Sequence, residues 1–85
     1  MKIKEGMIVR HVMDTDIAID VTGDFSGMVK LNASSLEIWN GVAAGKSVRE
    51  IALALTEQYE VTEEKAFDDV ERFCAEMVAQ GFFEA

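Results

Sequence analysis

Between residues 7 and 31, apolar and polar residues alternate along three short segments. These segments cover residues 8–12, 17–21 and 28–31, and they are rich in β-branched and other apolar side chains. A period of two places successive side chains on opposite faces of a strand. The residues between the segments, 14–16 and 22–27, are of types that tolerate turn backbones. The pattern therefore predicts a three-stranded antiparallel meander.

Two helix starts follow the third strand segment. Each has a Ser followed three residues later by a Glu, first Ser34 with Glu37 and then Ser47 with Glu50. This is the capping-box pattern, in which two side chains satisfy the free N–H groups at a helix start. Gly45 lies between the two signals and is typical of a helix stop. We expect two short helices on either side of Gly45.

A third and longer helix is expected to begin after Thr62. The acidic residues that follow Thr62 are favoured by the positive end of the helix dipole. Its apolar residues divide into two arcs: Phe67, Cys74 and Val78 on one side, and Ala66, Phe73 and Met77 on the other. Gly81 suits the helix end, and the aromatic pair after it can fold back under the helices. Together, the strand and helix patterns predict an α+β fold, a three-stranded antiparallel sheet followed by three helices. This order is similar to that of a winged helix-turn-helix module.

Length and charge narrow the classes of function. The 85 residues are 49% hydrophobic, which predicts one folded domain over residues 1–85. The net charge of −8 repels phosphate, so neither nucleic acid nor an anionic membrane is an expected partner. The N-terminal residues do not have the pattern of a signal peptide, and no apolar run reaches the roughly 20 residues that span a bilayer. We expect a soluble, cytoplasmic protein.

The reactive side chains do not form a catalytic or metal-binding pattern. Cys74 and His11 are the single cysteine and the single histidine, fewer than the three or four ligands of a zinc site. We interpret Cys74 as a small packed side chain, His11 as a surface residue and Trp39 as part of the core. We therefore expect no metal, no cofactor and no enzymatic activity, although a small enzyme stays as a weaker alternative.

The order and spacing of several short motifs make this chain resemble a known family. They are Val-Lys-Leu-Asn at 29–32, Ile-Trp at 38–39, Gly-Lys-Ser-Val-Arg-Glu-Ile-Ala at 45–52, Tyr-Glu-Val-Thr at 59–62 and Gly-Phe-Phe at 81–83. From about residue 17 to the end, the chain resembles the PqqD family, the leader-binding domains known as RiPP recognition elements. Relatives often have an aromatic residue before the Leu-Asn, where this chain has Met28-Val29. The peptide preference of those relatives therefore does not transfer to this chain.

The resemblance implies a stand-alone recognition domain, or peptide chaperone. Such a domain binds the leader of a ribosomally made precursor peptide as an added strand. It then presents the leader to a modifying enzyme, a radical SAM maturase or another type, in the synthesis of pyrroloquinoline quinone or another modified peptide. The expected fold supports this binding mode independently of the resemblance. The third strand has a free edge that can pair with an extended chain, and the third helix supplies an apolar wall. The expected peptide-binding residues are Gly27, Met28, Val29, Lys30, Leu31, Phe67, Val70, Glu71 and Cys74. The sequence leaves open which edge of the third helix lines the groove.

A winged-helix transcriptional regulator is the alternative function. Its third helix should be basic in order to contact DNA phosphates. Here residues 62–80 carry Lys65 and Arg72 as their basic residues, against Glu63, Glu64, Asp68, Asp69, Glu71 and Glu76. This balance argues against DNA binding. We expect a monomer or a weak homodimer, because an exposed strand edge invites self-pairing.

Overall fold

The main sheet is an antiparallel meander with the strand order β2-β3-β4. β2 (Met7–Val12) pairs with β3 (Thr15–Asp20), and β3 pairs with β4 (Met28–Leu31). This confirms the predicted sheet in the computed structural model, which describes residues 1–22 and 27–85. The predicted turn at 22–27 lies mostly outside the described residues. The turn predicted at 14–16 is wrong, because Thr15 already belongs to β3. The turn is shorter, since Met13 adopts the left-handed φ of 56° that suits a two-residue hairpin loop.

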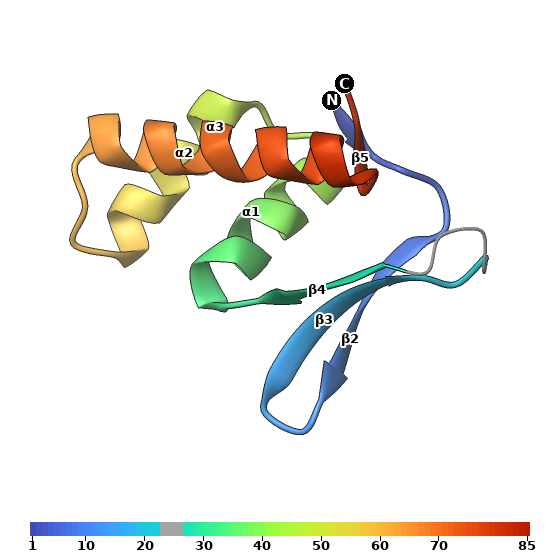
Figure 1. Cartoon of the computed structure of the whole chain (residues 1–85). Helices are drawn as coiled ribbons and strands as arrows, with labels where there is room; N and C mark the ends of the chain where they lie inside the picture. The colour runs from blue at the N-terminus through green and yellow to red at the C-terminus, as the bar shows by residue number, and fades with distance from the viewer. Residues whose placement is uncertain (23–26) are drawn as a thin grey trace.

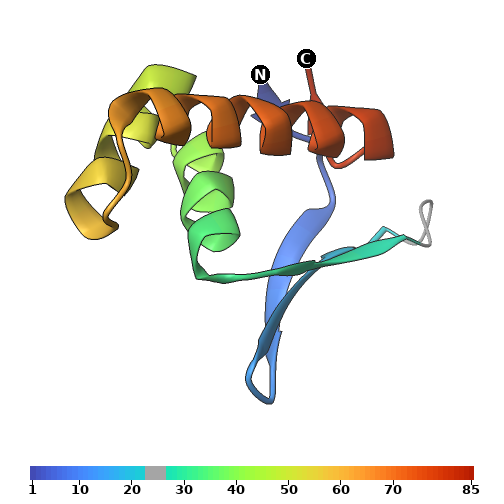
Figure 2. The same ribbon diagram turned by 60° about the vertical axis from the view of Figure 1, so that its left-hand side comes forward.

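Three helices follow the sheet and lie on one side of it (Figures 1 and 2). They are α1 (Ala33–Ala43), α2 (Val48–Gln58) and α3 (Glu63–Gln80). The predicted caps of α2 and α3 are confirmed: Ser47 and Glu50 form the full capping box, and the Thr62 hydroxyl accepts a hydrogen bond from the Lys65 N–H at 3.2 Å. No helix in the described ranges has both the length and the apolar character needed to cross a bilayer.

α1 begins earlier than the sequence pattern predicts. Its N-cap is Asn32, whose side-chain oxygen accepts a hydrogen bond from the Ser35 N–H at 2.8 Å. The predicted cap, Ser34, lies inside the first turn and donates its hydroxyl to the same Asn32 oxygen at 3.0 Å. Asparagine is as good a cap as serine, and Asn32 comes first along the chain. The helix therefore starts directly after β4.

The two ends of the chain meet in a second, smaller sheet that the sequence analysis did not predict. β1 (Lys2–Ile3) pairs antiparallel with β5 (Phe83–Glu84). The N- and C-termini therefore lie side by side, next to the end of α3 (Figure 1). Strands of two residues are too short to show a period, so this pairing gives no pattern in the sequence.

The core lies between the helices and one face of the main sheet. An aromatic cluster joins α1, α3 and the C-terminal residues, with ring centroids of Trp39 and Phe83 at 5.2 Å and those of Phe73 and Phe83 at 6.1 Å. Phe82 is also buried and meets the Trp39 ring nearly edge to face. This confirms Trp39 as a core residue and confirms that the aromatic pair folds back under the helices.

Candidate functional site

β4 is one of the two edge strands of the main sheet, and β2 lies at the other edge. β4 pairs with β3 on one side, and among the described residues no strand pairs with its other side. Of the expected site residues, Gly27 precedes this strand and Met28, Val29, Lys30 and Leu31 form it. Val29 and Leu31 point toward the core, while Met28 is 64% exposed and Lys30 is exposed, as the alternation predicts. The strand therefore presents a free backbone edge and an outward row of two side chains.

An apolar hollow of about 330 Å³ lies where β4 leads into α1. Three parts of the chain meet around it: the start of α1 with its cap, the end of α2 with the residues after it, and the first half of α3. The lining residues are Asn32, Ala33, Ser34, Ile38, Leu55, Tyr59, Val61, Ala66 and Asp69. None of the expected site residues is among them. Sequence reasoning missed the hollow because its walls come from segments far apart in the chain.

Phe67 and Glu71 of α3, expected at the groove, are not among the residues that line this hollow. Phe67 lines a separate hollow of about 240 Å³ together with Arg49, Ala52 and Leu53 of α2. Glu71 is one helical turn further along the same side of α3. The hollow beside the end of β4 is lined by two other residues of α3, Ala66 and Asp69. A role of Phe67 and Glu71 in peptide binding therefore stays a prediction.

Val70 and Cys74 belong to the core. Val70 is 0% exposed and Cys74 is 4% exposed, so neither side chain offers surface to a ligand in this structure. Burial raises the pKa of the Cys74 thiol, because the charged thiolate is poorly solvated there. The thiol is therefore protonated at neutral pH and does not have the reactive form of a catalytic cysteine.

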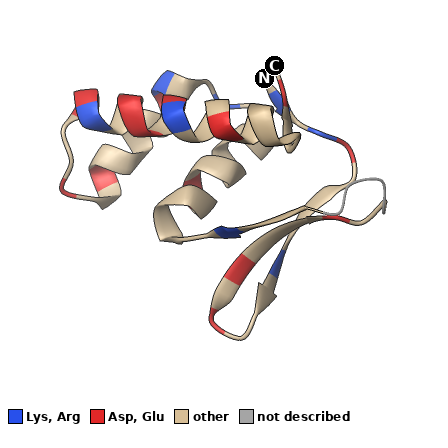
Figure 3. Ribbon diagram, viewed as in Figure 1, with Lys and Arg blue, Asp and Glu red and all other residues tan. Residues whose placement is uncertain are grey.

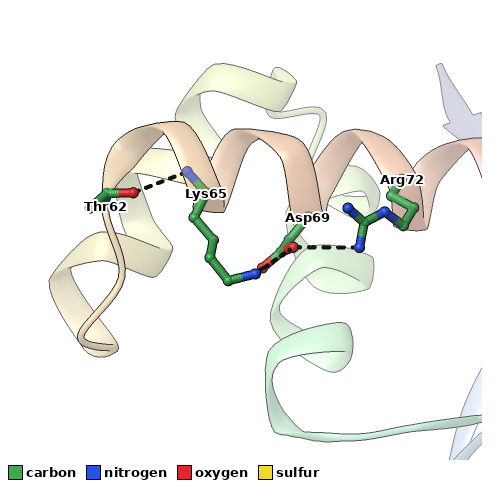
Figure 4. A network of polar contacts seen from close by, with 4 residues as sticks. All are labelled: Thr62, Lys65, Asp69 and Arg72. Carbon is green, nitrogen blue, oxygen red and sulfur yellow. Dashed lines mark hydrogen bonds and ion pairs between the residues drawn. The ribbon is translucent and has the colours of Figure 1, made fainter.

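Two cations flank the carboxylate that lines the hollow. Lys65 Nζ lies 3.3 Å from Asp69 Oδ1, and Arg72 Nη1 lies 3.9 Å from the same oxygen (Figure 4). Both cationic side chains are mostly exposed. Glu64 and Asp68 line the same part of the surface as these two cations, so the charges beside the hollow are mixed.

Other polar groups in the described ranges do not form a metal-binding cluster. His11 is paired with Asp16, with 2.9 Å between Nδ1 and Oδ1, and the pair is exposed at the end of the β2-β3 hairpin. No group of three or more His, Cys, Asp or Glu side chains there is arranged to hold a metal ion. The free strand edge and the apolar hollow are thus the features that define the candidate site.

The sequence matches one family model over residues 12–82, and the description of that model is coenzyme PQQ synthesis protein D (PqqD). The chain belongs to the PqqD family. The match begins at the end of β2 and covers the edge strand, the hollow and all three helices. A comparison with curated protein sequences gave no match.

Two solved structures have the same fold as this PqqD-family chain. The first is TbiB1 in complex with the TbiA(beta) leader peptide, at a TM-score of 0.85 and 22% identity, covering 100% of this chain and 96% of that one. The second is lasso peptide synthetase B1 complexed with the leader peptide, at a TM-score of 0.86 and 19% identity, covering 99% and 96%. These similarities confirm the predicted arrangement of a three-stranded sheet followed by three helices.

Proposed function

We propose that this PqqD-family domain binds the leader of a ribosomally synthesised precursor peptide as an added strand along the free edge of β4. The observation that carries the proposal is the geometry of that edge, which ends at an apolar hollow between α1 and α3. Both solved relatives were captured with leader peptides, which supports the same class of ligand here. The ligand is an extended peptide segment with at least one apolar side chain.

Each part of the site has a separate role in holding the peptide. Backbone N–H and C=O groups of Met28 to Leu31 give affinity that does not depend on the peptide sequence. The hollow selects an apolar side chain near the end of the added strand. Lys30, which is exposed on β4, favours carboxylates in the paired peptide. The proposed specificity is therefore for an acidic leader segment with an apolar anchor.

The domain itself does no chemistry in this proposal. It raises the effective concentration of the precursor at a modifying enzyme, of the radical SAM class or another, in the cytoplasm. Strand pairing and an apolar hollow require no metal or cofactor. The acidic surface of α3 (Figure 3) argues against the alternative of a DNA-binding regulator, because it offers few phosphate contacts.

Titration calorimetry with the leader of the precursor peptide encoded beside this chain tests the proposal. We expect metal-free binding, together with amide shifts on leader addition at Gly27 to Leu31 and at the residues around the hollow. Lys30→Glu should weaken the binding of an acidic leader about 1.5- to 5-fold, because an exposed charge pair contributes only a few tenths to about 1 kcal/mol. Lys4→Glu makes the same charge change at an exposed position outside the site and should leave the affinity unchanged.

Two results would contradict the proposal. The first is the absence of binding at high micromolar concentrations for the encoded leader. The second is a set of amide shifts confined to the surface between α2 and α3, around Phe67, which would place the peptide at that separate hollow instead.

A further inference from the structure

The outer face of the main sheet, which points away from the helices, is apolar. The pairing register places Ile8, Ile19 and Met28 side by side in one row across the three strands. Val12, at the end of β2, lies on the same face and is 49% exposed. An antiparallel sheet with one solvated face normally carries polar residues on that face. This pattern of apolar residues therefore indicates a surface that is covered in function.

The next row on the same face joins an apolar centre to two cations. Arg10, Ile17 and Lys30 are direct cross-strand neighbours, so Ile17 lies between an Arg and a Lys at a spacing of about 5 Å per strand. Within residues 1–22 and 27–85, neither cation forms an ion pair. The described positions that face outward on β2, β3 and β4 carry no carboxylate. They are Ile8, Arg10, Val12, Thr15, Ile17, Ile19, Met28 and Lys30.

The packing of the chain separates the two faces of the sheet. Met7, Ala18 and Leu31 of the inner face belong to the buried core, whereas Ile8, Ile17 and Ile19 are neither in the core nor packed against it. Both ribbon views show the three helices on the inner side only (Figures 1 and 2). The described outward-facing positions carry Arg10 and Lys30 and no carboxylate, which contrasts with the acidic α3 (Figure 3). The outer face is thus available to a partner, with a charge opposite to that of the whole chain.

We propose that this outer sheet face is the docking surface for the enzyme that modifies the bound peptide, through an apolar enzyme surface flanked by carboxylates. The inference rests on the proposed function. A peptide paired to β4 becomes the next strand of the same sheet, so an enzyme seated on the outer face touches the domain and the peptide together. Charge complementarity to Arg10 and Lys30 selects the acidic partner surface. The domain and its peptide then form one continuous recognition surface.

Two other occupants fit the observations less well. In a dimer formed face to face, the Arg10 and Lys30 of one copy would meet the same cations of the other, and like charges oppose this contact. An anionic membrane would attract the two cations but repel a chain of net charge −8. Both remain outcomes that the experiment can detect.

The test compares two variants on β2 and β3, away from the peptide edge, with two matched controls on α2. Arg10→Glu and Ile17→Thr change the outer face, while Arg49→Glu and Leu53→Gln make comparable changes at exposed positions of α2. The probe is the purified peptide-modifying enzyme encoded beside this chain, titrated with the leader-loaded domain. We expect the affinity for the enzyme to fall about tenfold in each outer-face variant, while leader affinity stays within about twofold. The controls should match the native chain in both measurements.

The outcomes separate this inference from the proposed function. If the native chain does not bind the leader, the proposed function fails and the inference fails with it. If the leader binds but the outer-face variants hold the enzyme as tightly as Arg49→Glu does, the inference alone is overturned. It is also overturned if native protein cosediments with vesicles of equal phosphatidylcholine and phosphatidylglycerol and Arg10→Glu releases it, or if Arg10→Glu changes the mass of the free domain in sedimentation equilibrium.

Discussion

Ala33→Phe fills the apolar hollow without disturbing the core, and it tests whether the hollow receives a peptide side chain. Ala33 is the first residue of α1, is exposed, and lines the hollow at the end of β4. A Phe ring there occupies part of the about 330 Å³ that a peptide side chain would otherwise enter. Because the position is exposed, the change in the free energy of unfolding should stay within about 0.5 kcal/mol. The fold should therefore survive while the binding site is blocked.

The expected loss of affinity follows from the burial of one apolar side chain. A fully buried Leu, Val or Phe contributes roughly 1.5–3 kcal/mol, which corresponds to about a 10- to 150-fold change in Kd. Titration calorimetry with the leader peptide measures this change, and urea unfolding measures stability in parallel. Ala43→Phe is the matched control, since Ala43 is exposed on the same helix and is not part of the lining. Equal leader affinity in the two variants, or an unchanged affinity in Ala33→Phe, would refute the assignment of the hollow.

Three further predictions concern the scaffold. Gly41→Ala should lower the urea midpoint, because its Cβ would lie 2.6 Å from the Ile51 Cγ1 atom. Overpacking costs about 1–3 kcal/mol and outweighs a helix-propensity gain of about 1 kcal/mol, so a raised midpoint would contradict the packing. Cys74 should react with a disulfide reagent far more slowly in native protein than in urea, because it is buried. The pKa of its thiol is raised in the folded protein, so the free energy of unfolding falls as the pH rises above about 8.5. Cys74→Ala should reduce this fall of the unfolding free energy with pH in alkaline unfolding curves. Ser47→Ala should cost about 1 kcal/mol in thermal unfolding by removing the α2 cap. The hydrogen bond from the Ser47 N–H lowers the pKa of Glu50. This hydrogen bond therefore stabilises the fold above about pH 4.3, and its contribution is lost as the pH falls further. In Glu50→Gln, the free energy of unfolding should show less of that acid dependence.

The sequence predicts well the features that depend on residues close together in the chain. Strict alternation placed Val29 and Leu31 inward and Met28 and Lys30 outward, and the structure agrees at all four positions. The start of α3 was also predictable, because its cap is set by neighbours within one turn. The start of α1 was less certain in principle, since Asn32 and Ser34 can both act as caps and the choice depends on where β4 ends.

The candidate site was harder to predict because it depends on long-range packing. The apolar stripe of α3 is wide enough to face either α2 or the sheet, and nothing local decides which edge meets which neighbour. That Phe67 lines a hollow together with residues of α2 can be seen only in the three-dimensional structure. The hollow needs Ala33, Tyr59 and Ala66 to come together, and no single stretch of sequence contains that information. Sequence alone could therefore identify the strand edge, but not the pocket at its end.

The distribution of charge explains why the average charge of the chain is a poor guide to its ligands. A net charge of −8 predicts repulsion of anions at long range, where the field of the whole molecule acts. At contact distance, screening leaves mainly the charges within about 8–10 Å. At the peptide edge these include Lys30 on β4, with Arg10 in the same row on the outer face of the sheet. The same molecule can therefore reject polyanions such as DNA and still favour a short peptide with a few carboxylates, because the peptide meets only the local charges.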